Sequence, residues 1–193
     1  MYPEYNEIIR RLKQNDASLT LLDFRQKNLT SEESKEIFKA LEENTTVTKL
    51  QFLGNNSSGV AAIALSAMLR KNHTIEELEL GTNEINNEDI IHIASGLEKN
   101  ASVTILDLNS NLFDAAKPIA DLLEHNNHIS EIDLSNSNIN KAGFLVIYKA
   151  LQRNENSSLT AFNAYFTSVS CINDFDNLCR INASRLESTI RLF

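Results

Sequence analysis

The stretch "IEELELGTNEI", residues Ile75–Ile85, is the clearest unit of a repeat that fills most of the chain. It has apolar residues at its first, fourth, sixth and eleventh positions and Asn at its ninth. The same template begins at residues 19, 47, 75, 103, 129 and, more weakly, 159, so successive units are 28, 28, 28, 26 and 30 residues apart. Repetition at such a period is typical of proteins that stack one supersecondary unit many times.

A helical pattern lies between these units. It consists of an apolar pair four residues apart, which is one helical turn, and an Asn three residues further on. We therefore predict that each repeat is a short strand, a turn and a helix around one shared core. Because Asn tolerates left-handed backbone conformations, we expect each of these Asn residues to adopt one just past its helix. The pairs are Ile37/Leu41, Leu65/Leu69, Ile93/Leu97, Ile119/Leu123 and Ile147/Leu151, and the Asn residues are Asn44, Asn72, Asn100, Asn126 and Asn154.

The starts of the predicted helices carry residues that cap helix N-termini. Thr30 and Glu33 have the spacing of a capping box, in which each side chain accepts a hydrogen bond from the other residue's backbone. Asn87, Asp114 and Asn140 are predicted N-caps, because short polar side chains satisfy the free N–H groups of a first turn.

The pattern LxxLxLxxNxL with a period near 28 resembles the leucine-rich repeats of the ribonuclease-inhibitor-like class, over about residues 19 to 185. "IEELELGTNEI" and "VTILDLNSNLF" match it in full, whereas Lys27, Ser137 and Thr167 replace the ninth-position Asn. The resemblance implies an α/β fold. The architecture that it implies is a right-handed leucine-rich-repeat solenoid, which forms a segment of a horseshoe. A parallel sheet would line the concave face and helices the convex face.

We expect residues 1–193 to form a single leucine-rich-repeat domain. Residues 1–18 match the helix half of a repeat and are predicted to be an N-terminal capping helix, followed by six repeats over 19–185. One further period of 28 residues predicts a C-terminal strand over 186–193, with Ile190 and Leu192 buried. Such a strand would leave an open sheet edge, so we expect a monomer or a dimer paired through that edge.

Composition narrows the classes of partner. The chain has 193 residues, 42% of them hydrophobic, and a formal net charge of -8, which argues against nucleic acid and anionic membranes as partners. No run of 18 apolar residues predicts a membrane span, and the first residues lack the order of a secretory signal. With only two cysteines, these features predict a cytoplasmic protein.

We expect no catalysis, no cofactor and no metal. The sequence has no phosphate-binding Gly-rich loop and no G-x-S-x-G motif. Cys179 occupies a core slot of its repeat, and neither it nor Cys171 has the spacing of a metal ligand. His125 and His128 fit a solvated helix end better than a metal site.

Acidic side chains gather on the predicted concave face. Residues three, five and seven of each strand point away from the core, because side chains alternate along a strand. Fifth-position carboxylates would then stack on neighbouring strands, which costs stability and suggests a surface for a basic partner. Aromatic residues near the C-terminal end would serve as anchors at its border. The candidate binding residues are Glu77, Glu79, Asp107, Glu131, Asp133, Tyr165 and Phe193.

The function predicted from these features is non-catalytic protein–protein interaction through the concave sheet, as an adaptor or an effector. Ribonuclease inhibitor, the repeat domain of tropomodulin and the sensor ends of innate-immune receptors look similar, and all work by protein contact. A regulator of an enzyme, such as a GTPase activator or an enzyme inhibitor, is the alternative. The abundance of Asn, Ile and Lys also fits a bacterial effector delivered into a host cell, as an alternative location.

Overall fold

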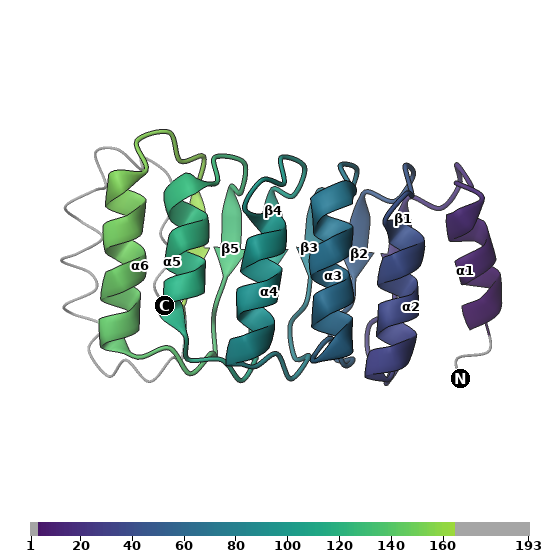
Figure 1. Cartoon of the computed structure of the whole chain (residues 1–193), viewed down its shortest axis with the longest axis horizontal. Helices are drawn as coiled ribbons and strands as arrows, with labels where there is room; N and C mark the ends of the chain where they lie inside the picture. The colour runs from purple at the N-terminus through teal and green to yellow at the C-terminus, as the bar shows by residue number, and fades with distance from the viewer. Residues whose placement is uncertain (1–3, 165–193) are drawn as a thin grey trace.

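The computed structural model describes residues 4–164 and consists of helices and strands in strict alternation after a first helix (Figure 1). The strands form one parallel sheet in the order β1-β2-β3-β4-β5-β6, and the helices form a second layer on one side of it. The strands are β1 (Leu21–Asp23), β2 (Lys49–Gln51), β3 (Glu77–Glu79), β4 (Ile105–Asp107), β5 (Glu131–Asp133) and β6 (Ala161–Asn163). The helices are α1 (Tyr5–Lys13), α2 (Ser31–Leu41), α3 (Val60–Lys71), α4 (Asn87–Leu97), α5 (Ala116–His125) and α6 (Lys141–Arg153).

The register of the sheet follows the repeat period. Leu22 pairs with Leu50 and Leu50 with Leu78, each 28 residues apart. The shortened and lengthened repeats keep the same register, since Leu106 pairs with Ile132. The α/β leucine-rich-repeat solenoid predicted from the repeat is therefore confirmed.

The core lies between the sheet and the helix layer. The fourth-position and sixth-position strand residues are buried in every repeat from the first to the fifth, as predicted, and the apolar helix pairs pack against them. Phe24, Phe38 and Phe52 fill the first repeats, with ring centroids 5.0 to 5.6 Å apart. No repeat could bury these faces alone, so stacking stabilises the fold.

The asparagines after the helices adopt a different conformation from the one predicted. Asn72 and Asn126 have φ of -77° and -80° with extended ψ, and the positive-φ residues of the described chain do not include Asn44, Asn100 or Asn154. The left-handed prediction is therefore wrong for these five. Contacts with the preceding repeat explain the difference, because each side chain joins its own helix end to the one before it.

These five asparagines form what we call the helix-end ladder. Asn100 Nδ2 donates to the carbonyl oxygens of Leu69 and Asn72 at 2.8 and 3.1 Å. Its Oδ1 accepts from the backbone N–H groups of Ser102 and Val103. The same pattern recurs in each repeat, so the ladder satisfies carbonyl groups that a helix C-terminus otherwise leaves free. Its members are Asn44, Asn72, Asn100, Asn126 and Asn154.

A second, shorter row, the turn ladder, consists of the ninth-position residues Asn55, Asn83 and Asn111. Asn111 Nδ2 donates to backbone carbonyl oxygens of its own and the preceding repeat, and its Oδ1 accepts from the backbone of Asn83. The row ends where the sequence replaces Asn at the ninth position, which is Ser137 in the fifth repeat. Ser137 is buried, and within residues 4–164 its hydroxyl has no hydrogen-bond partner.

The N-caps of the helices agree in part with those predicted from the sequence. Thr30 and Glu33 form the predicted capping box, and Asn140 caps α6. The cap of α4 is Asn86 rather than Asn87, because Asn86 can form a capping box with Asp89. The residue before α5 is Ala115 rather than Asp114, and no side chain caps this helix.

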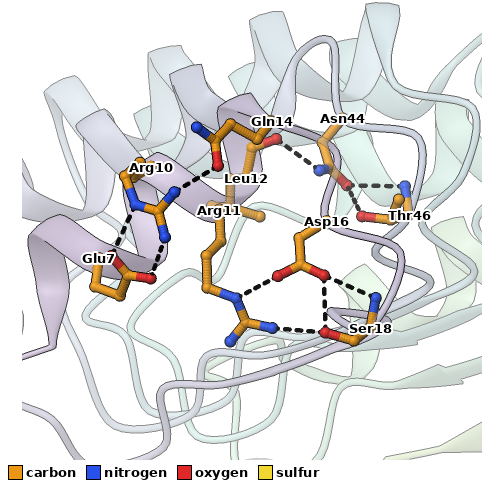
Figure 2. A network of polar contacts seen from close by, with 9 residues as sticks. All are labelled: Glu7, Arg10, Arg11, Leu12, Gln14, Asp16, Ser18, Asn44 and Thr46. Carbon is orange, nitrogen blue, oxygen red and sulfur yellow. Dashed lines mark hydrogen bonds and ion pairs between the residues drawn. The ribbon is translucent and has the colours of Figure 1, made fainter.

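Helix α1 lies at the N-terminal end of the helix layer, and Figure 2 shows the polar contacts that join it to the next repeat. Its Leu12 is buried, and the carbonyl oxygen of Leu12 accepts from Asn44, which links α1 to the helix-end ladder. Arg11 bonds to Asp16 and Ser18 in the loop that follows. The Arg11 and Ser18 hydrogen bonds lower the pKa of Asp16 to about 2.

The predicted C-terminal strand over 186–193 lies outside the described residues, as do the last part of the sixth repeat and the edge proposed for dimer pairing. Among residues 4–164, no helix is long and apolar enough to cross a membrane.

Candidate binding surface on the sheet

The face of the sheet opposite the helices carries the predicted row of carboxylates. Register pairs Gln51 with Glu79, Glu79 with Asp107 and Asp107 with Asp133, so the fifth-position side chains are neighbours across four strands. We call Glu79, Asp107 and Asp133 the acidic stripe. Adjacent parallel strands lie about 4.8 Å apart, so these like charges repel one another.

Sequence reasoning missed the partners at the N-terminal side of this face. Lys49 Nζ lies 2.5 Å from Glu77 Oε2 and 3.3 Å from Glu79 Oε1. Gln51 Nε2 donates to Glu79 at 3.0 Å. Lys49 stands 28 residues before Glu77, so the repeat spacing itself could have identified the pair. Glu77 and Glu79 are therefore partly neutralised.

Asp107 lies at the centre of the stripe, between Glu79 and Asp133. Burial raises the pKa of Asp107, bonds from Asn109 lower it, and the charges of Asp133 and Glu79 raise it further. Asn109 donates from its backbone N–H and from Nδ2, at 2.8 and 2.6 Å. No cation pairs with Asp107 within the part of the chain that the structure describes. Among the described residues, the Asp107 carboxylate is therefore stabilised by the amide N–H groups of Asn109 alone.

Asp133 and Glu131 continue the acidic surface toward β6. Asp133 accepts a hydrogen bond from the backbone of Ser135 at 2.8 Å, and Glu131 is exposed at the third position of β5. Asp23, at the opposite end of the sheet, pairs with Arg25, and this hydrogen bond lowers the pKa of Asp23 to about 2. The acidic stripe is thus partly neutralised at its β3 end, whereas the exposed Glu131 adds a further carboxylate beside its β5 end.

The structure brings together five of the seven predicted binding residues on this face, namely Glu77, Glu79, Asp107, Glu131 and Asp133. Tyr165 and Phe193 lie outside the described residues. Within 4–164, no group of three or more His, Cys, Asp or Glu side chains is arranged to hold a metal ion. The arrangement places a row of carboxylates on one face of the sheet.

Comparison with known proteins identifies the repeats. The family model described as "TMOD/LMOD Leucine-rich domain" matches residues 3–112, more than half of the chain. Among solved structures, "Leiomodin-1 Actin-Binding Site 2 (ABS2)" has a TM-score of 0.65 at 22% identity, covering 95% of this chain and 98% of that one. The tropomodulin C-terminal domain of Caenorhabditis elegans has a TM-score of 0.52 at 16% identity, covering 95% and 96%.

The search of curated proteins finds no match. The two solved structures are too distant to show more than the fold, which they share with this chain over nearly its whole length. The family model gives a narrower assignment than the general repeat class, because it describes the leucine-rich domain of one group of proteins. The chain belongs to the TMOD/LMOD leucine-rich domain family.

Proposed function

We propose that this chain is a non-catalytic protein-binding module that uses the acidic sheet face, and that actin is its partner. The observation that carries the proposal is the acidic stripe, in which Asp107 keeps a costly charge beside Glu79 and Asp133. Stability alone would favour a neutral residue there, whereas a partner with basic side chains would offset the repulsion.

Actin is proposed because of the family. The leiomodin-1 structure with the same fold carries the words "Actin-Binding Site 2" in its description. An adaptor role and a cytoplasmic location are part of the same proposal. The comparisons give no support to a bacterial effector, and no described residue favours the alternative of a GTPase activator or enzyme inhibitor.

The test is calorimetric titration of monomeric actin with the full chain and with Glu79→Gln/Asp107→Asn/Asp133→Asn. These changes remove three charges but keep the shapes and most acceptor atoms, so the fold is retained. We expect binding by the wild type and at least about tenfold weaker binding by the triple variant, from lost charge pairs. Glu32→Gln/Glu36→Gln/Glu43→Gln is the matched control, with the same charge change on the helix side.

The outcomes separate the two parts of the proposal. If the triple variant binds actin with unchanged affinity, the acidic stripe is not part of the interface, although actin is still the partner. Absence of wild-type binding would remove actin. If the helix-side control weakens binding as much as the stripe variant, the effect is one of overall charge and the surface assignment fails.

A further inference from the structure

The helix layer carries an apolar surface that the fold does not use. The outer face of α2 is charged and self-paired, with Lys35 bound to Glu32 and Lys39 to Glu36. The same helical position, 28 residues apart, is Lys35 in α2, Ile63 in α3 and Ile91 in α4. Ile63 and Ile91 are 53% and 55% exposed. Exposed isoleucines on successive helices are costly in water and indicate a contact surface.

This surface leads into a groove between α4 and α5 of about 640 Å³. Half of its lining residues are apolar, namely Ile91, Ala94, Ala115, Pro118 and Leu122, and the others are polar or charged; we call it the α4–α5 groove. The neighbouring helix pairs are joined closely through glycines: Gly96 of α4 lies against the backbone of α3, and Gly143 of α6 against α5. Neither glycine lies at the contact between α4 and α5. The groove lies between these two helices, which lack such a close approach.

The rim of the groove is charged at one end. Two acidic residues, Glu98 and Asp121, and two basic ones, Lys117 and His125, line it. Asp121 pairs with Lys117, and its carbonyl oxygen contacts His125, whereas Glu98 has no ion-pair partner among residues 4–164. The last turn of α4 contains no basic residue, so Glu98 is not neutralised from within its own helix. The C-terminal end of the groove therefore favours a positive charge.

We infer that the α4–α5 groove binds an amphipathic helix with an apolar stripe and basic flanking residues. A groove between two neighbouring helices suits a helix whose anchors recur at i, i+3 or i+4, and i+7. The ten residues of α5 extend about 15 Å at 1.5 Å per residue, which matches nearly three turns of such a partner. Basic flanks complement Glu98, the carboxylate of the groove that has no ion-pair partner among residues 4–164. This surface lies on the opposite layer from the acidic stripe and is independent of the proposed actin contact.

The probe for this inference is a synthetic 18-residue helical peptide with a Leu stripe and Lys flanks, labelled for fluorescence anisotropy. One comparison peptide has Glu in place of Lys, and another has the Lys composition in scrambled order without a stripe. The protein variants are Ile91→Ser in the groove and Ile63→Ser outside its lining. The two side chains match in type, helical position and exposure, so neither change disturbs the core.

We expect the Lys-flanked peptide to bind the wild type and Ile91→Ser to weaken binding about fivefold or more, as loss of a buried aliphatic contact requires. Ile63→Ser should change affinity less than about twofold, and Glu98→Gln should weaken it about two- to threefold at low salt. Backbone NMR shifts should be confined to α4 and α5.

Several results would overturn the inference. Equal losses for Ile91→Ser and Ile63→Ser would show general stickiness of the helix layer. Equal binding of the scrambled peptide would show attraction by charge alone, and equal binding of the Glu-flanked peptide would exclude a basic partner. Wild-type dimers in light scattering that dissociate on Ile91→Ser, with no peptide binding, would make a second copy the occupant.

Discussion

Two rows of polar residues run along the solenoid, one at the helix ends and one across the sheet. In the helix-end ladder, each side chain from Asn44 to Asn126 is buried and bonded on both sides. In the acidic stripe, Glu79, Asp107 and Asp133 repeat one charge on adjacent strands. Both rows come from the same register, in which equivalent positions of successive repeats become neighbours.

The difference teaches what repetition does to a side chain's energy. An amide carries a donor and an acceptor, so each ladder member satisfies the one before it and the gain recurs in every repeat. A carboxylate carries only acceptors, so each further member of the stripe adds repulsion. The ladder stabilises the stack, whereas the stripe costs stability that binding can offset.

Replacement of a central ladder residue should have the largest effect. Asn100→Ala leaves the carbonyl groups of Leu69 and Asn72 and the N–H groups of Ser102 and Val103 without partners. We expect a loss of about 3–5 kcal/mol in the free energy of unfolding, since several buried polar groups become unsatisfied. Urea denaturation followed by circular dichroism measures this, and a loss below about 1 kcal/mol would contradict the ladder's structural role.

Asn154, the last ladder residue that the structure describes, should tolerate the same change better. Asn154 is only half-buried, although it still donates to Leu123 and Asn126. Water can replace its partners, so we expect Asn154→Ala to cost about 1–2 kcal/mol in the same denaturation experiment. A cost equal to that of Asn100→Ala would mean that burial does not set the strength of the ladder.

The repeat period and the acidic stripe could both be predicted from the sequence, because a 28-residue offset fixes which side chains are neighbours across the sheet. The backbone conformation of the asparagines that follow the helices could not be predicted from the sequence. The left-handed rule for Asn is local, and it holds at Asn15, which has φ of 51°. At Asn72 and Asn126, bonds to the preceding repeat override it.

Other features escaped prediction because they depend on side-chain contacts between repeats. Lys49 and Glu77 occupy the third position of the adjacent strands β2 and β3, and their ion pair depends on how the two side chains meet. The α4–α5 groove depends on how closely helices approach one another, which Gly96 and Gly143 set on either side of it. Helix starts shifted by one residue because Asn86 and Asn87 are both good caps.

Neutralising the centre of the stripe should stabilise the fold. Burial and the neighbouring carboxylates raise the pKa of Asp107, so the folded protein takes up a proton more readily than the unfolded chain. The ionised form therefore lowers stability above the folded pKa, and this cost disappears as pH falls through it. Asp107→Asn keeps the acceptor Oδ1 and should gain about 0.5 kcal/mol at pH 7.

Thermal unfolding at two pH values measures this gain. The difference between Asp107→Asn and wild type should vanish near pH 3, where both side chains are neutral. Glu88→Gln, on the helix side, is a control whose effect should not follow the titration of the stripe. A loss of stability at pH 7 would mean that the bonds from Asn109 outweigh the repulsion, and the stripe would no longer contrast with the ladder.

The smallest effect is expected where the turn ladder stops. Ser137 is buried, and its hydroxyl has no hydrogen-bond partner within the described residues, in the slot that Asn55, Asn83 and Asn111 fill in other repeats. Ser137→Ala removes an unsatisfied group, so the free energy of unfolding should change by less than about 0.5 kcal/mol, while Asn111→Ala should cost about 2–3 kcal/mol. Similar losses for both would mean that Ser137 has a partner, and the ladder would then extend into the fifth repeat. A change close to zero in the free energy of unfolding on Ser137→Ala would show what the ninth position requires. It would stabilise the stack only when an amide, with both a donor and an acceptor, occupies it.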